Sequence, residues 1–396
     1  MPVEKFSIAR DDTVYEAFPH LCRTTSGRIL IAYRESNGHV ASEYCRLIVR
    51  YSDDAGHSWT DRQIITDESR TADEVMPYWN CPKIQQLEDG RVLMLCEAYD
   101  YPPGEWGVED QACVFFWFSE DEGKTFGDAQ LTAVHGICPD QITETTDGRW
   151  ILPTNIRNRE NQIVQAITVS DDGGTSWNPP SIIHNEHELD EASLITLPTG
   201  ELIAYERQDS GRPLQKMISK DRGRTWSGPF DTLNPAAIGM PIAGLTQDGL
   251  ILITGRYGIR SRWRVDMSDE TWRERIAKRG IVIPKVPGNE PNERFTAGFE
   301  RGPFLEETET EIILGGGGSS VHTFAFIEPV ESALSPNVAD QKGLLLPLDL
   351  DASPFADSGY TGWVEYERGK FLVANYILDN APLAQIRGYR FTLDDF

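Results

Sequence analysis

The stretch SDDGGTSW, residues 170–177, recurs along the chain and decides its fold class. Related copies are SDDAGHSW at 52–59, SEDEGKTF at 119–126 and SKDRGRTW at 219–226. In the shared pattern, Ser-x-Asp-x-Gly-x-Ser/Thr-aromatic, the Asp carboxylate can accept backbone N–H groups across its own turn, and the Gly permits a positive φ. The aromatic ring can pack between neighbouring sheets. Four copies, spaced roughly 50 to 70 residues apart, indicate one small antiparallel sheet per repeat, as in a β-propeller.

A second repeat consists of an apolar strand, a Gly-containing turn and another apolar strand, which is typical of a β-hairpin. Its seven copies are LCRTTSGRILIAYR at 21–34, IQQLEDGRVLMLCE at 84–97, ITETTDGRWILPTN at 142–155, LITLPTGELIAYER at 194–207, AGLTQDGLILITGR at 243–256, the degenerate FLEETETEIILGGG at 304–317 and WVEYERGKFLVANY at 363–376. Seven hairpins in 396 residues favour seven four-stranded blades. The alternative is six blades with an elaborated insert at about 258–300. We expect the N-terminal FSIAR to complete the last blade, which makes residues 1–396 a single all-β propeller domain.

The composition excludes several classes of function. The formal net charge is −25 and no basic tract offsets it, so nucleic acid is not an expected partner. No apolar run is long enough for a membrane helix. The start, MPVEKFSIAR, lacks the apolar core of a signal peptide, which favours the cytoplasm unless a leader has been removed. The six cysteines form no CxxC pair, and HNEHELDE at 184–191 lacks a helical context, so we predict neither a metal nor a cofactor.

The hairpins also indicate where polar side chains should gather. The start of the first strand and the end of the second lie at one edge, opposite the turn. Nine residues before the turn glycine, this edge includes Phe18, Glu191, Met240 and Tyr360. In the degenerate hairpin Thr310 replaces the glycine as the reference position, and the corresponding residue is Arg301. Seven residues after the glycine the same edge includes Arg34, Glu97, Asn155, Arg207, Arg256 and Tyr376. Asp140 lies one residue beyond this edge. We expect these residues to surround the mouth of the central channel and to bind an anionic ligand through arginines.

The repeats resemble the Asp boxes, also called BNR repeats, of the sialidase superfamily, and the resemblance covers nearly the whole chain. In sialidases a Glu stands at the start of a strand, and an Arg follows it about sixteen residues later. EASLITLPTGELIAYER places Glu191 and Arg207 in those positions. The Gly-Tyr-Ser motif that carries the sialidase nucleophile corresponds to SGYTGW, which contains Tyr360. The resemblance therefore implies that Glu191 acts as a base towards Tyr360, which needs one because its ordinary pKa is about 10.

The chain departs from the sialidase pattern in the first blade. Where sialidases have the Arg-Ile-Pro motif with the first of three carboxylate-binding arginines, EAFPHL at 16–21 offers Ala17 or Phe18. Arg34, Arg256 and Arg301 would have to supply that clamp from other positions. The sialidase acid/base Asp also has no clear counterpart. The loop RESNGHVASEYC offers Glu35, His39 and Glu43 instead, of which we take His39 and Glu35 as candidates.

Three functions are consistent with these residues. The first is a sialidase-like exo-glycoside hydrolase that cleaves a terminal acidic sugar, with Tyr360 and Glu191 as the nucleophilic pair. The second is a polysaccharide lyase that performs β-elimination on a uronate with an arginine, Tyr360 and His39. The third is a non-catalytic glycan-binding propeller that uses its tryptophans for stacking. In each case the expected partner is an oligosaccharide or polysaccharide, and for the two enzymes it is an anionic one.

Overall fold

The computed structural model describes thirteen stretches of the chain. They are residues 3–41, 43–69, 76–101, 112–184, 189–208, 213–236, 238–259, 262–266, 304–307, 311–315, 320–351, 357–379 and 381–396. Strands dominate these stretches. The helical elements among them are α2 (Val330–Ala333) and two short 3₁₀ turns, η3 (Val338–Asp340) and η4 (Leu393–Asp395). No described helix has the length and apolar character needed to cross a membrane.

Six antiparallel sheets form the blades of a propeller. The first blade is β2 (Tyr15–Arg23), β3 (Ile29–Ser36), β4 (Tyr44–Ser52) and β5 (Gln63–Ser69). The second is β6 (Met76–Trp79) and β7 (Lys83–Gln86), which both pair with β8 (Val92–Tyr101), followed by β9 (Cys113–Ser119) and β10 (Gln130–His135). The third is β11 (Thr143–Glu144), β12 (Trp150–Arg157), β13 (Ile163–Ser170) and β14 (Ser181–Ile182). The fourth is β15 (Leu189–Thr196), β16 (Leu202–Gln208), β17 (Pro213–Ser219) and β18 (Ser227–Ala236).

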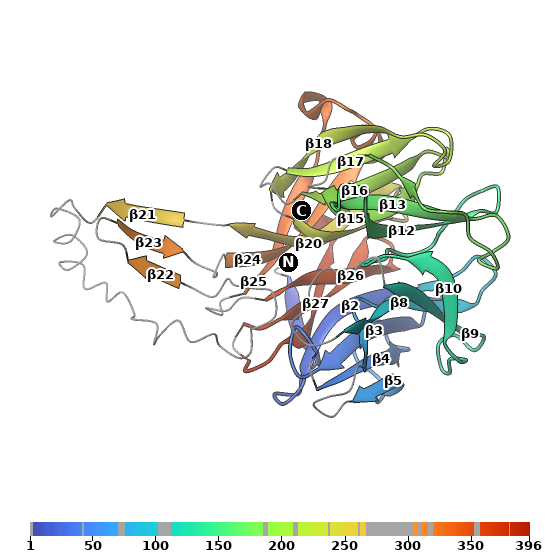
Figure 1. Ribbon diagram of the computed structural model, residues 1–396, viewed down its shortest axis with the longest axis horizontal. Helices are drawn as coiled ribbons and strands as arrows, with labels where there is room; N and C mark the ends of the chain where they lie inside the picture. Colours follow the sequence, from blue (N-terminus) through green and yellow to red (C-terminus); the bar gives the residue numbers. More distant parts are fainter. Residues whose placement is uncertain are drawn as a thin grey trace.

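The last two blades contain long-range pairings. The fifth is β19 (Ile238–Leu245), β20 (Leu250–Ile259), β24 (Ser320–Pro329) and β25 (Leu344–Asp351). The sixth is β26 (Ser358–Glu367), β27 (Lys370–Ile377), β28 (Gln385–Thr392) and β1 (Glu4–Ala9). Because the first strand of the chain pairs with β28, the ring is closed by its two ends, as expected for FSIAR. Figure 1 shows the blue β2 beside the red β26 and β27, and these strands are in contact.

The all-β propeller is therefore confirmed, and the number of blades is six, the smaller of the two numbers considered. The sixth, degenerate hairpin, at 304–317, contributes β22 (Phe304–Glu307) and β23 (Glu311–Gly315) to a separate three-stranded sheet with β21 (Arg262–Asp266). The three strands of this sheet lie between β20 and β24 in the chain. β20 and β24 nevertheless pair directly with each other. The hairpin pattern was real, but its strands pair within an insertion of the fifth blade instead of forming a blade.

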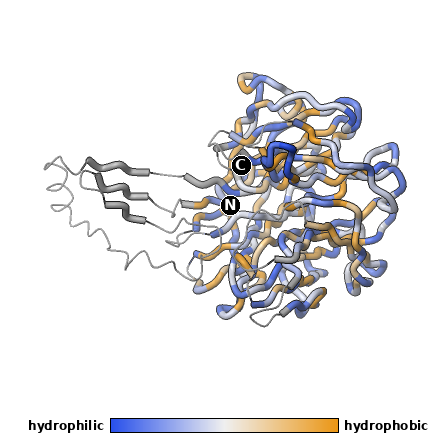
Figure 2. Tube along the Cα trace, viewed as in Figure 1, coloured by the Kyte–Doolittle hydropathy of each residue, from blue (hydrophilic) through white to orange (hydrophobic). Residues whose placement is uncertain are grey.

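The Asp boxes form the turns between the outer strands of the blades and pack against neighbouring blades. In the first box, Asp54 accepts Ser52 Oγ–H at 2.7 Å and Ser58 N–H at 2.8 Å, and Ser52 Oγ accepts Gly56 N–H at 2.8 Å. Gly56 has φ of 81°, and a Cβ at this position would approach Leu372 of the last blade to 2.7 Å. The box therefore has the turn geometry expected from the sequence and closes the contact between two blades. Figure 2 shows apolar segments along the strands and hydrophilic ones at many turns.

The innermost strands share an irregularity near their start. The strand register shifts between Ala17 and His20 in β2, and between Asp190 and Ser193 in β15. Comparable shifts occur in β19 and β26. The backbone has a left-handed φ at Phe18 (57°), Cys138 (49°), Glu191 (45°), Met240 (27°) and Gly359 (111°). Such bulges re-aim side chains and recur beside functional sites. Here they place the chemically distinctive residues of several blades at one end of the inner strands.

Candidate active site

Tyr360 and Glu191 meet at this end of the inner strands. Tyr360 on β26 donates a hydrogen bond through Oη to Oε1 of Glu191 on β15. The second carboxylate oxygen of Glu191 lies 2.9 Å from Nη1 of Arg207, on β16, and accepts the backbone N–H of Met240 at 3.0 Å. The side chain of Glu191 is 6% exposed and that of Arg207 is 23% exposed, so the pair is enclosed while the guanidinium is reached by solvent. The structure thus assembles three of the predicted site residues.

The surroundings fix where the proton of this pair resides. Burial raises the pKa of Glu191, but the Arg207 guanidinium and the Tyr360 hydroxyl outweigh it and hold this pKa below its usual value. Burial and the adjacent carboxylate raise the pKa of Tyr360 well above its usual value. In the resting site Tyr360 is therefore a neutral phenol and Glu191 an ionised carboxylate that is already positioned to accept the phenolic proton.

Arg256 lies on the other side of Tyr360. Its Cζ is 5.3 Å from the centre of the Tyr360 ring, within the range of a cation–π contact. Its Nη1 donates to the backbone oxygen of Ser358 at 2.5 Å and approaches the Tyr376 hydroxyl at 3.4 Å. Two guanidiniums, those of Arg207 and Arg256, therefore lie next to the Tyr360–Glu191 pair, where they would stabilise a developing phenolate or an anionic ligand.

A second acid–base pair, His39 with Asp357, lies nearby. His39 Nδ1 is 2.8 Å from Asp357 Oδ2, which also accepts a hydrogen bond from the Tyr15 hydroxyl. The other carboxylate oxygen accepts the Tyr376 hydroxyl at 2.9 Å. Burial raises the pKa of Asp357, but His39, Tyr15 and Arg256 outweigh it and hold this pKa well below its usual value. The His39 side chain is 18% exposed, so the imidazole is oriented by a carboxylate and still reached by solvent.

Phe18 joins the two pairs. Its ring centre is 5.4 Å from that of His39, 5.3 Å from that of Tyr360 and 5.1 Å from that of Tyr376. Phe18 is one of the two residues, with Ala17, that the resemblance to sialidases sets where an arginine would stand. The buried Phe18 ring therefore lies between a phenol–carboxylate pair and an imidazole–carboxylate pair.

Asp357 was not selected from the sequence. It lies three residues before Tyr360, in the stretch DSGY, and the only available signal was a carboxylate directly ahead of the tyrosine motif. Hairpin counting could not find it because Asp357 precedes the strand and lies outside the repeated positions.

Several predicted site residues have other roles in the structure. Arg34 is fully buried, donates to the Tyr78 hydroxyl at 2.8 Å and to the backbone oxygen of His39, and thereby supports the loop that carries His39. Glu35 follows it on β3 and therefore faces the other side of the strand. The Glu35 carboxylate lies 3.0 Å from Arg62 and is not part of the cluster.

The remaining predictions concern the channel wall and the insertion. Glu97 is fully buried and accepts the N–H of Cys138 at 2.9 Å, and burial raises its pKa. Asp140 is buried and accepts the N–H of Leu194 at 2.8 Å, and burial raises its pKa to about 6. Arg301 lies outside the described residues. The structure thus brings Tyr360, Glu191, Arg207, Arg256 and His39 together and places Arg34, Glu97 and Asp140 behind them or in the interior.

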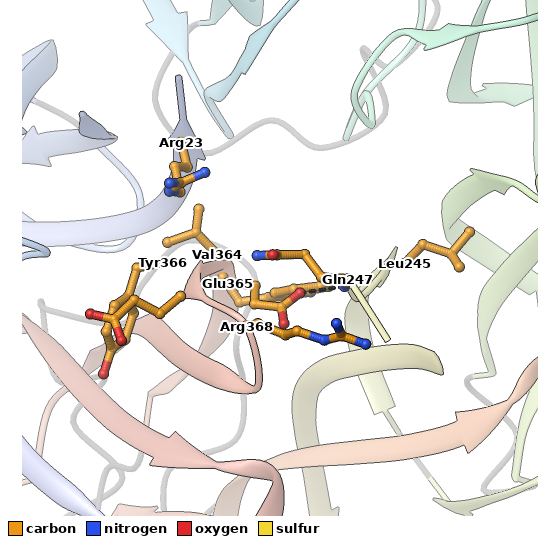
Figure 3. A pocket seen from close by; sticks show the side chains of 9 residues that line it. Arg23, Leu245, Gln247, Val364, Glu365, Tyr366 and Arg368 are labelled. Atoms are coloured by element: carbon orange, nitrogen blue, oxygen red, sulfur yellow. Dashed lines mark hydrogen bonds between the residues drawn. The ribbon is translucent and has the colours of Figure 1, made fainter. Parts of the chain in front are cut away.

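The far end of the inner strands is also hollow. A cavity of 260 Å³ is lined by residues from several inner strands, among them Leu21, Ile84, Ile242 and Trp363, and marks the central channel. A wider hollow of 560 Å³ shares Trp363 and Val364 with it and lies at the far end of β26. Figure 3 shows the side chains of Arg23, Gln247, Glu365 and Arg368 around this hollow. Tyr360 lies near the start of β26, so the acid–base site and this hollow belong to opposite ends of the channel.

The fold and the site define a six-bladed propeller with an acid–base cluster where its inner strands begin. Residues 19–276 match the model of the family described as the BNR repeat-like domain, so the chain belongs to that family. No curated protein sequence matches the chain.

Solved structures show the same fold. A protein of unknown function from Dyadobacter fermentans is 18% identical, with 98% of each chain covered and a TM-score of 0.67. The Hadza microbial sialidase Hz136 is 15% identical, with 98% of this chain and 68% of that chain covered and a TM-score of 0.64. The intramolecular trans-sialidase of Ruminococcus gnavus, solved with oseltamivir carboxylate, is 13% identical, with 96% and 95% covered and a TM-score of 0.58. At these identities the likeness establishes a sialidase-like propeller.

Proposed function

We propose that the protein is a glycoside hydrolase that cleaves a terminal, anionic sugar from an oligosaccharide or polysaccharide. The observation that carries this proposal is the hydrogen bond between the Tyr360 hydroxyl and the Glu191 carboxylate, with Arg207 on the opposite oxygen. A tyrosine is a weak nucleophile unless a base takes its proton, and this base is in contact with it. The sialidase-like fold of the neighbours supports the same reaction class.

Each residue of the cluster has a role in the proposed reaction. Tyr360 Oη would attack the anomeric carbon while its proton passes to Glu191, and the bond to the leaving oxygen would break. The imidazole of His39, oriented by Asp357, would give that oxygen a proton as general acid. A water molecule, deprotonated by His39, would then attack the same carbon. The Tyr360–sugar bond would break and the phenolate would recover its proton from Glu191, so the net reaction consumes one water.

Arginines would bind the anionic group of the sugar. Arg207 and Arg256 lie beside the reacting pair, and a guanidinium can bind a carboxylate through two parallel hydrogen bonds.

The test is a product assay on a panel of acidic oligosaccharides, followed by mass and by ultraviolet absorbance. Hydrolysis adds the mass of one water and creates no absorbing double bond. We expect Tyr360→Phe to lower turnover by at least about 1,000-fold. The matched control is Tyr389→Phe, which removes a buried hydroxyl that donates to Asp349 at 2.9 Å in the same blade, and it should retain activity.

Two results would contradict the proposal. An absorbing product without added water would identify the lyase reaction instead. Binding of the panel without turnover, equal in wild type and Tyr360→Phe, would identify a glycan-binding propeller.

A further inference from the structure

A cluster of two thiols and a carboxylate lies in the interior beside the acid–base site. Cys81, between β6 and β7, Glu97 on β8 and Cys138, between β10 and β11, have their ligand atoms all within 4.8 Å of one another. All three side chains are buried. In the part of the chain that the structure describes, this is the one group of three or more Cys, His, Asp or Glu side chains close enough to hold a metal ion.

No motif marks this cluster along the chain. Cys81 and Cys138 are far apart in the chain and belong to no ligand motif. They come together because the inner edges of the second and third blades are adjacent and because Cys138 adopts a left-handed φ of 49°.

The carboxylate is held in a fixed orientation, as expected of a ligand. Oε1 of Glu97 accepts the side-chain amide of Asn80 at 2.8 Å and the backbone N–H of Cys138 at 2.9 Å. Oε2 has weaker contacts, with the N–H of Cys81 at 3.4 Å and the Cys96 thiol at 4.0 Å. Hydrogen bonds that orient a ligand from behind are a regular part of metal sites. Here the short hydrogen bonds engage Oε1, so lone pairs of Oε2 remain available to a metal ion.

A fourth possible ligand atom lies at the edge of the cluster. It is Oε1 of Glu191, the oxygen that also accepts the Tyr360 hydroxyl, and it lies 3.7 Å from Cys138 Sγ. Two ligands of a tetrahedral ion bound at about 2.0 to 2.3 Å are separated by roughly 3.3 to 3.8 Å, so this spacing matches one edge of such a tetrahedron. Two sulfurs and one or two carboxylate oxygens form a donor set that suits Zn²⁺ and other divalent ions with an affinity for sulfur.

We propose that Cys81, Cys138 and Glu97 bind a thiophilic divalent cation of the Zn²⁺ class, with the fourth coordination position facing Glu191. The proposal is independent of the proposed hydrolysis, because it concerns binding and predicts a measurable site even in a protein without activity.

The experiment is a titration of the full chain, kept reduced, with Co²⁺ alone. We expect one ion per chain, with the visible bands of a tetrahedral site and an ultraviolet thiolate-to-cobalt band that Zn²⁺ abolishes. Cys81→Ser and Cys138→Ser should each weaken binding by roughly 100-fold, and Glu97→Gln by roughly 10- to 100-fold. The matched control is Cys22→Ser, which removes another buried thiol outside the cluster and should bind as wild type does.

A second measurement needs no variant and so remains decisive if a substitution prevents folding. X-ray absorption of the wild-type chain loaded with Zn²⁺ should show two sulfur neighbours at about 2.3 Å together with oxygen neighbours. A spectrum with oxygen neighbours alone, equal losses in Cys22→Ser and Cys138→Ser, or a Cys81–Cys138 disulfide that persists under reducing conditions would overturn the proposal.

Discussion

The hydrogen bond between Tyr360 and Glu191 can be measured as a coupling energy. Tyr360→Phe removes the hydroxyl and keeps the ring, whose contacts with Phe18 and Arg256 do not involve the oxygen. A hydrogen bond to a charged group contributes about 1.5 to 3 kcal/mol, so the free energy of unfolding should fall by that amount. Glu191→Leu removes both carboxylate oxygens, and with them the same bond and the charge opposite Arg207 Nη1 at 2.9 Å, so it should cost about 3 to 5 kcal/mol.

Because both variants remove one shared bond, their effects should not add. The double variant should be less destabilised than the sum by about 1.5 to 3 kcal/mol. Urea unfolding at pH 7, followed by circular dichroism and tryptophan fluorescence, measures all three values, and coincident transitions with equal slopes validate the comparison. As a control, Tyr389→Phe combined with Glu191→Leu should be additive within about 0.5 kcal/mol. Additivity within the same margin for Tyr360→Phe with Glu191→Leu would refute the assigned contact.

Two further predictions concern the backbone beside the site and a buried carboxyl. Gly359→Ala should lower the free energy of unfolding by at least about 2 kcal/mol, because φ is 111° and a Cβ would overlap Arg256. Gly90→Ala, with φ of 91° and no atom within 4 Å, should cost only about 1 kcal/mol in the same urea assay; equal costs would contradict the crowding at Gly359. Burial and the nearby Glu35 raise the pKa of Glu16 to about 8. The charged and titratable groups around Glu16 are Glu35, Asp11, Arg50 and Tyr33. The folded protein retains this proton after the unfolded chain has lost it, so stability should fall as pH rises from about 5 to 8, by up to about 1.4 kcal/mol per pH unit. Glu16→Gln should flatten this dependence, and an unchanged slope would contradict it.

The repeats were sufficient to predict the propeller, its closure and the end of the channel that carries the polar cluster. They were insufficient to predict the number of blades. A hairpin pattern identifies two strands that pair with each other, but it does not indicate to which sheet the two strands belong. The decisive contact, β20 with β24, joins segments separated by the 304–317 hairpin. A pairing across so long an insertion leaves no local signal in the sequence.

Hairpin counting also identified more site residues than the cluster contains. Arg34 and Glu97 occupy the same repeated position as Arg207 and Arg256, yet both are fully buried. Arg34 is covered because the His39 loop folds back and supplies a carbonyl acceptor, and Glu97 is covered by the backbone of Cys138. Equivalent positions in a repeat share a backbone location, whereas their exposure depends on the loops above them. Glu35 was selected from the stretch that follows the first hairpin and not by hairpin counting, and it faces the side of β3 opposite Arg34 because adjacent residues of a strand face opposite sides.

An uncharged aromatic residue, Phe18, lies between the two acid–base pairs. His39, Tyr360 and Tyr376 pack edge to face or at a tilt around its ring, and the Cζ atom of the buried Arg34 lies 4.5 Å from the ring centre. The guanidiniums of Arg207 and Arg256 already have partners, since Arg207 lies against Glu191 and Arg256 donates to the backbone of Ser358. An anionic ligand would therefore share Arg207 with Glu191, and weakening that ion pair would raise the pKa of the carboxyl. Under the proposed function, ligand binding would in this way make Glu191 a better acceptor for the Tyr360 proton, so that binding of an anionic sugar would itself activate the proposed nucleophile.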